Sequence, residues 1–171
     1  MIIFVEGPDN ACKNDMYSKF LESSHKVSNE SNVYMYDIAG EHEDVRHALY
    51  CAHSKMVMIM DMCDKYKNLC MVINGGPLSQ VIRALEIDDV RLASEMSSVF
   101  SMRQYHDVHI ISVFSSDTDK EMQKSYRDVS SRHMGVISDH SKRNSYTMFN
   151  NKRTENTYKL FNSDVLALIN K

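Results

Sequence analysis

Residues 2–15 read IIFVEGPDNACKND, a short apolar run that leads into a damaged phosphate-loop signature. In the intact pattern, G-x-x-x-x-G-K-[ST], glycines shape a loop of backbone N–H groups, the lysine reaches the phosphates and the hydroxyl binds Mg²⁺. Gly7 and Lys13 stand at the required spacing, but Cys12 replaces the second glycine and Asn14 replaces the hydroxyl residue. The stretch predicts a strand, an anion-binding loop and a helix. The candidate nucleotide-binding residues are those of the loop: Gly7, Pro8, Asp9, Asn10, Ala11, Cys12, Lys13 and Asn14.

Length and charge indicate one domain with no general attraction to polyanions. A chain of 171 residues can bury a single sizeable core, so we expect one domain over residues 1–171. The formal net charge of −3 provides no general pull toward nucleic acids or anionic membranes. The sequence therefore excludes a strongly basic nucleic-acid-binding protein.

Cysteine spacing and hydropathy indicate a protein of a reducing cytoplasm. No C-x-x-C pair is present, which favours free thiols at all four positions: Cys12, Cys51, Cys63 and Cys70. The strongly apolar run 56–60 is interrupted by Asp61 and is far shorter than the roughly 20 residues of a membrane span. We therefore expect no membrane association.

Short apolar runs alternate with helical patterns along the chain. Strands are predicted at residues 2–6, 33–37, 70–74, 108–114 and 158–161. Helices are predicted at residues 13–23, 41–66, 78–86, 89–104, 118–130 and 163–169. The polar run 138–156 predicts a solvated helix and loop. Apolar strands without alternation, separated by helices, predict a parallel sheet that is covered on both faces.

A second segment of the sequence supports the interpretation of residues 7–15 as a phosphate loop. GPDNACKND at residues 7–15 is similar to the phosphate loop of thymidylate kinases and related deoxynucleoside kinases, and VINGGPLSQVIRA at residues 72–84 is similar to their third strand and next helix. The resemblance extends to the element order of nearly the whole chain. It implies a three-layer P-loop nucleotide kinase fold with a five-stranded parallel sheet of order 2-3-1-4-5. The loop is also similar to that of nucleotide-kinase-like proteins of bacterial viruses, which implies a host cytoplasm.

The resemblance also implies roles for particular residues. Members of the family transfer the γ-phosphoryl group of ATP to a nucleoside or its monophosphate, with Mg²⁺ and an arginine-rich lid. Lys13 matches the phosphate-binding lysine, and Asp9 matches a carboxylate that contacts the acceptor sugar. Residues 125–135 match the lid, which makes Arg127 and Arg132 the catalytic candidates of an active enzyme together with Lys13.

Several positions depart from the family pattern. Asn74 and Gly75 stand where the family has an Asp-Arg pair, so they are the matching but altered substrate-binding candidates beside Asp9. Residues 51–56 lack an arginine common in that helix. Asn14 is a weak candidate for a metal ligand because its neutral side chain is longer than serine. These changes all remove charge or metal ligands from a reaction that depends on both.

The departures favour a degenerate nucleotide-binding protein with impaired or lost phosphoryl transfer. The alternative is an active deoxynucleoside monophosphate kinase that uses ATP and Mg²⁺. A second alternative is an interaction protein with no ligand, which acts through a protein partner or as a homodimer. Simpler interpretations also exist for single residues: Lys13 as a solvated lysine and Asp9 as a turn former. Cys12, at a helix N-terminus beside Lys13, is a candidate reactive thiol, but the sequence places no histidine or acid partner beside it, which argues against a nucleophilic enzyme. The histidines, including His109, are predicted to lie at the surface.

Overall fold

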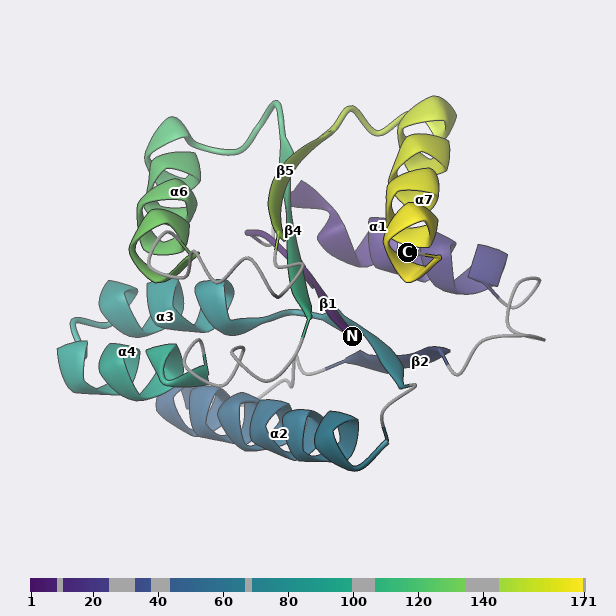
Figure 1. Ribbon diagram of the computed structural model, residues 1–171. Helices are drawn as coiled ribbons and strands as arrows, with labels where there is room; N and C mark the ends of the chain where they lie inside the picture. Colours follow the sequence, from purple (N-terminus) through teal and green to yellow (C-terminus); the bar gives the residue numbers. More distant parts are fainter. Residues whose placement is uncertain are drawn as a thin grey trace.

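The computed structural model describes residues 1–8, 11–24, 33–37, 44–66, 69–99, 107–134 and 145–170. Its strands pair in parallel in one sheet of order β2-β3-β1-β4-β5, and β1 is the central strand (Figure 1). The strands are β1 Ile2–Glu6, β2 Val33–Asp37, β3 Cys70–Asn74, β4 Val108–Ser115 and β5 Ser145–Asn151. The predicted α/β class with a parallel sheet is confirmed.

The central strand β1 is buried on both faces, as its unbroken apolar sequence predicts. Successive side chains point to opposite faces of a strand. Ile2 and Phe4 accordingly belong to one hydrophobic core, and Ile3 and Val5 belong to the other. The two cores hold β1 rigidly between them, which fixes the position of the loop that follows its last residue.

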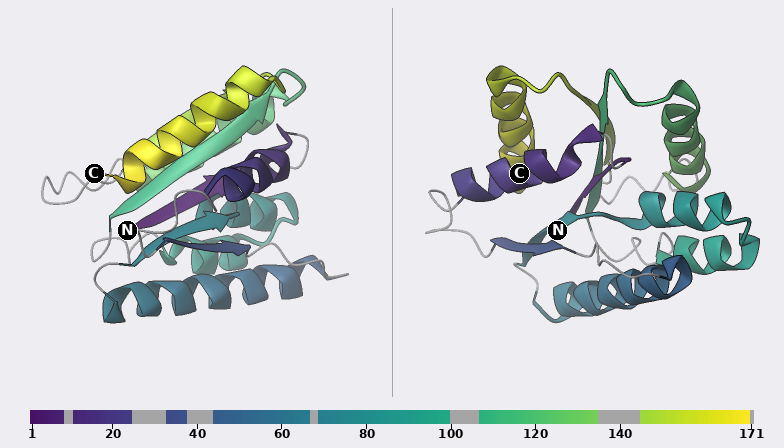
Figure 2. Two further views of the ribbon diagram at one scale, coloured as in Figure 1. Left: turned by 90° about the vertical axis from the view of Figure 1, so that its right-hand side faces the viewer. Right: turned by 180° about the vertical axis from the view of Figure 1, so that it is seen from behind.

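Six helices of the described residues cover the two faces of the sheet (Figure 2). Side chains of α1 and α7 pack in one core, and side chains of α2, α3, α4 and α6 pack in the other. None of these helices combines the length and the apolar character needed to cross a bilayer. The helices are α1 Lys13–Ser24, α2 Val45–Lys65, α3 Pro77–Glu86, α4 Val90–Ser97, α6 Lys120–Met134 and α7 Glu155–Ile169.

The C-terminal βα unit was predicted wrongly. The strand predicted at residues 158–161 lies inside α7, and the last strand is β5, within the polar run predicted as helix and loop. The physical reason is that β5 pairs only with β4 and lies at the edge of the sheet, where half-exposed side chains permit serine, threonine and asparagine. Thr154 caps α7 through its side-chain oxygen, which accepts the Thr157 N–H at 3.3 Å.

The expected surface position of His109 was also wrong. His109 lies in β4 with 3% of its surface exposed, and its Nδ1 is 2.7 Å from the Ser145 hydroxyl of β5. A buried imidazole needs such a polar partner. In this way a histidine inside an apolar strand helps to set the register of the edge strand.

The packing of α7 against the sheet depends on one aromatic side chain. Phe161 is fully buried and its ring meets Phe149 of β5 edge-on at 5.4 Å between centroids. We expect Phe161→Ala to lower the free energy of unfolding by about 3–5 kcal/mol, because it removes a large buried side chain and leaves a cavity. Urea titration followed by circular dichroism measures the change. Leu160→Ala is the matched control: Leu160 is 54% exposed, so a comparable loss there would contradict the explanation.

Candidate functional site

The loop after β1 begins with a glycine that the packing requires. Gly7 has φ +146°, and an added Cβ would lie 2.3 Å from the carbonyl oxygen of Val113 in β4. A side chain at this position would force the loop away from the sheet. The loop then leads to Lys13, the first residue of α1, whose surface is only 7% exposed. Lys13 is therefore not a solvated surface lysine.

Cys12, which stands where the pattern has its second glycine, adopts a backbone conformation that is typical of glycine. Cys12 has φ +53°, in the left-handed region that costs an ordinary side chain about 1–2 kcal/mol. The preceding carbonyl, that of Ala11, accepts a 3.1 Å hydrogen bond from the Asn151 side chain at the end of β5. The surrounding structure thus maintains the bend of a phosphate loop although the glycine is absent.

The residues at the expected metal position are bonded to one another. The Asn14 side-chain oxygen accepts hydrogen bonds from Lys13 Nζ at 3.2 Å and from Asn74 Nδ2 at 3.0 Å. Mg²⁺ requires open oxygen ligands, usually anionic ones, in a near-ideal octahedron. An amide oxygen that already accepts two hydrogen bonds, one of them from a cation, does not meet this need. This Lys13–Asn14–Asn74 triad argues against Asn14 as a metal ligand.

A buried carboxylate that the sequence analysis missed connects the loop to α3. Glu6, the last residue of β1, is fully buried. Its oxygens accept the backbone N–H groups of Leu78 at 3.3 Å and Ser79 at 2.6 Å, and also the Ser79 hydroxyl at 3.0 Å. These donors belong to the first turn of α3, where a carboxylate satisfies free N–H groups and the helix dipole. Glu6 therefore acts as the N-terminal cap of α3 from a different element.

Two neighbours of Glu6 extend this connection. An added Cβ at Gly76 would lie 2.3 Å from Glu6 Oε1, so the turn between β3 and α3 must carry glycine there. On the other side, the Ser79 hydroxyl lies 3.0 Å from the hydroxyl of Tyr126 in α6. Tyr126 in turn packs edge-on against Phe114 of β4. One hydrogen-bonded chain thus joins β1, α3 and α6.

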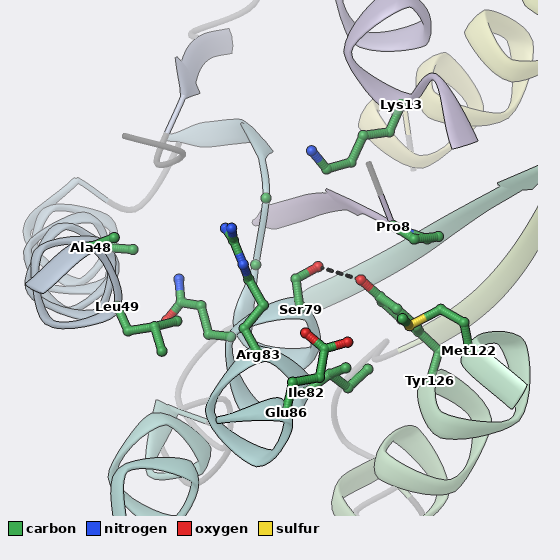
Figure 3. Close-up of a pocket in the computed structure, with 15 residues that line it drawn as sticks. Pro8, Lys13, Ala48, Leu49, Ser79, Ile82, Arg83, Glu86, Met122 and Tyr126 are labelled. Atoms are coloured by element: carbon green, nitrogen blue, oxygen red, sulfur yellow. Dashed lines mark hydrogen bonds between the residues drawn. The ribbon is translucent and has the colours of Figure 1, made fainter. Parts of the chain in front are cut away.

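A cavity of about 160 Å³ opens above this chain, between the loop and helices α2, α3 and α6 (Figure 3). The volume is close to the 150 Å³ that admits a single aromatic ring in an engineered apolar cavity. One wall is apolar and the other carries charged and amide groups. The lining residues are Gly7, Pro8, Lys13, Ala48, Leu49, Ala52, Gly75, Gly76, Ser79, Gln80, Ile82, Arg83, Glu86, Met122 and Tyr126.

The structure brings together only part of the predicted site. Gly7, Pro8, Lys13 and Gly75 line the cavity, and Asn14 and Asn74 lie beside it through the triad. Asp9 and Asn10 lie outside the described residues, so the predicted sugar contact of Asp9 stays a prediction.

The lid arginines are not part of the cavity wall. Arg127 and Arg132 are exposed on α6 and are absent from the described lining. Residues 125–134, predicted as part of a lid, continue α6 as regular helix. The helical periodicity predicted at residues 118–130 simply extends one turn further, so this part of the lid is not a separate segment.

Four lining or supporting residues were missed: Glu6, Gln80, Arg83 and Glu86. The available signal was a carboxylate at the end of a wholly apolar strand and charged residues next to the apolar face of residues 77–86. Helical periodicity alone assigns such charges to solvent. It does not show that another helix and a loop face them across a cavity.

Comparison with solved structures supports the fold assignment. The chain is similar to thymidylate kinase from Ehrlichia chaffeensis, with a TM-score of 0.51, 12% identity, and 99% of this chain and 98% of that chain covered. It also matches shikimate kinase from Acinetobacter baumannii in complex with shikimate, with a TM-score of 0.40, 10% identity, and 98% and 92% covered. No family model and no curated protein sequence matches. At 12% identity the likeness to thymidylate kinase shows that the two chains share a fold, and it shows no more than the fold.

The pH dependence of stability tests the state of Glu6. Burial raises the pKa of the Glu6 carboxyl from 4.5 to about 7, although Ser79, Leu78 and Lys13 act in the opposite direction. Because the folded pKa is the higher one, the folded state binds more protons between these values, and the free energy of unfolding falls as pH rises through this window. The loss is about 3 kcal/mol. Urea titrations at pH 5 and pH 8 measure it.

Glu6→Gln removes this part of the pH dependence because the amide does not titrate. It also lowers stability at pH 5, where it replaces a hydrogen-bonded carboxyl oxygen with an NH₂ group facing N–H donors. Glu22→Gln, at an exposed position of α1, should keep the slope of the natural protein. If Glu6→Gln also keeps that slope, Glu6 does not titrate in this range.

Paired glycine substitutions test the strain at Cys12. We expect Cys12→Gly to raise the free energy of unfolding by about 1 kcal/mol, because glycine adopts the left-handed conformation without steric cost. Cys51→Gly, in the interior of α2, should instead lower it by about 0.5 kcal/mol. Thermal and urea unfolding of both variants measure the difference, and the same sign at both positions would refute the strain argument.

Proposed function

We propose that the protein binds a nucleoside phosphate between the loop 7–14 and α3, and that it has lost metal-dependent phosphoryl transfer. The observation that carries this proposal is the Lys13–Asn14–Asn74 triad. In phosphoryl transfer the protein mainly positions the groups and neutralises charge, with Mg²⁺ bridging the phosphates. Asn14 and Asn74, the two neutral amides of the triad, bond to each other and stand at positions where the resemblance implies a metal ligand and a carboxylate.

Retention of anion binding is supported by features that do not depend on a metal. The loop ends at the N-terminus of α1, where free N–H groups and the helix dipole favour an anion. Lys13 lies at the same point and lines the cavity. Gly7 keeps the loop close to β4, and Cys12 keeps its bend. The residues present can therefore orient a phosphate group without a cation.

Loss of transfer is supported by the charges that the described cavity lacks. Gly75 occupies the position of the family arginine, and Asn74 occupies that of the neighbouring carboxylate. No group of three or more His, Cys, Asp and Glu side chains that could hold a metal occurs among the residues that the structure describes. ATP and Mg²⁺ would be the cofactors of an active enzyme, but the described donor set does not fit the ion.

Calorimetry with ATP, ADP and dTMP, each with and without Mg²⁺, tests the proposal together with a coupled kinase assay. We expect at least one nucleotide to bind with an affinity that Mg²⁺ changes by less than about twofold. Lys13→Ala should weaken binding at least about tenfold, the loss of one charge-assisted contact. Lys124→Ala, an exposed lysine of α6 outside the cavity, is the matched control.

Two results would replace the proposal. Turnover above about 1 s⁻¹, the low end for kinases, that Lys13→Ala abolishes would establish an active deoxynucleoside monophosphate kinase. The second result is that no nucleotide binds, while the protein forms a dimer whose stability does not change when Lys13 is substituted. This result would establish the interaction protein.

A further inference from the structure

The cavity is lined by an arginine, Arg83, although the arginine that the resemblance implies at position 75 is absent. Gly75, with φ +91°, has no side chain to offer a ligand, and Arg83 lies eight residues later on α3. Both residues line the same cavity. Figure 3 shows the Arg83 side chain extending from α3, with its guanidinium between Ala48 of α2 and Lys13 of the loop. Arg83 thus presents a positive charge to the same space as Lys13.

Arg83 differs from three other arginines of the described chain. Each of these forms an ion pair: Arg46 with Asp89 at 3.1 Å, Arg91 with Glu95 at 3.2 Å and Arg153 with Asp117 at 3.0 Å. Arg83 has no hydrogen bond or ion pair with any residue that the structure describes, although Glu86 lines the same cavity. Its planar fork of donors is therefore available to an anion in the cavity.

A second, independent observation points to a ligand in this space. Gln80 lines the cavity and is only 5% exposed. Its Oε1 atom is buried and accepts no hydrogen bond from the described residues, while its Nε2 lies 3.8 Å from the Met56 sulfur. A buried acceptor without a donor costs about 1–3 kcal/mol. The oxygen is covered by neighbouring atoms, so a ligand with an N–H or O–H group removes this cost only when the Gln80 amide turns toward the cavity.

We infer that Arg83 binds the phosphate of a nucleoside monophosphate in place of the arginine missing at position 75, while the Gln80 amide turns and its oxygen accepts a hydrogen bond from the same ligand. The inference rests on the proposed function and names its ligand class. A guanidinium binds phosphate oxygens in a bidentate manner. Together with Lys13 it supplies two positive charges, which Glu86 of the same lining offsets in part.

The chemistry of the cavity also limits the rest of the ligand. Glu86 of α3 lines the cavity, and the Gln80 amide reaches it by turning, so the part of the ligand that faces α3 must donate hydrogen bonds. Ala48, Leu49 and Ala52 of α2 provide an apolar surface for a flat ring. A phosphate, a hydroxylated sugar and a base with N–H groups satisfy all three requirements. The volume of about 160 Å³ admits about one ring, so the rest of such a ligand lies at the open side of the cavity.

Calorimetry of the full chain without Mg²⁺ tests the inference, with dTMP, dCMP, dAMP, dGMP, thymidine and inorganic phosphate as probes. Arg83→Gln should lower the affinity for the best-bound monophosphate by about tenfold to a hundredfold, the range for a hydrogen bond to a charged group. It should change the affinity for thymidine by less than about twofold. Gln80→Leu should lower the affinities for the monophosphate and for the nucleoside to the same extent, about tenfold.

Matched variants separate charge from geometry. Arg91→Gln removes an arginine of α4 that is paired with Glu95 outside the cavity, so binding should stay as in the natural protein. Arg83→Lys keeps the positive charge but lacks the two parallel N–H donors of a guanidinium. Its affinity for the monophosphate should therefore lie between those of the natural protein and of Arg83→Gln.

Failure of the inference and failure of the proposed function give different results. If Lys13→Ala abolishes monophosphate binding but both Arg83 variants stay within about twofold of the natural protein, Arg83 is not a phosphate ligand and the proposed function stands. If the natural protein binds none of the monophosphates, ATP or ADP, the proposed function falls with it.

Discussion

The buried Glu6 carboxylate is the interaction on which the candidate site depends. It lies at the end of the central strand β1 and accepts hydrogen bonds from two backbone N–H groups and one hydroxyl in the first turn of α3. Burial of a carboxyl is unfavourable unless it is bonded in this way. The result is that α3 starts at a fixed place relative to the loop 7–14. The cavity residues of α3 and the loop lysine therefore face each other at a defined separation.

The fold and the chemistry of the site have diverged to different degrees. The described parts of the loop, which are the turn at Gly7, the left-handed residue at position 12 and the helix that begins with Lys13, follow the backbone that the phosphate-loop pattern predicts. The side chains that would hold a cation are replaced by Asn14 and Asn74, which bond to each other. Backbone N–H groups can hold an anion whatever the side chains are, whereas a metal site depends on specific oxygen ligands. This difference supports the proposal that the protein binds an anion without metal-dependent transfer.

Much of the fold followed from local sequence, and the exceptions have a common cause. The bounds of β1, β2 and β3 match the prediction because continuous apolar runs between two helical layers leave little ambiguity. The strand β5 was missed because an edge strand carries polar side chains that resemble a loop. Of the site, the loop was predictable from its motif. Glu6, Gln80 and Arg83 were not, because their roles depend on which elements lie opposite them.

The contact between Glu6 and Gly76 also constrains how this chain can change over time. A Cβ at position 76 would come within 2.3 Å of the carboxylate oxygen, so a side chain there is not compatible with Glu6 in its present place. Divergent copies of this chain that acquire alanine at position 76 must also move or shorten the residue at position 6, and must find another partner for the N–H groups of Leu78 and Ser79. The constraint runs in one direction, because a smaller residue at position 6 meets no clash with Gly76, 70 residues later in the sequence.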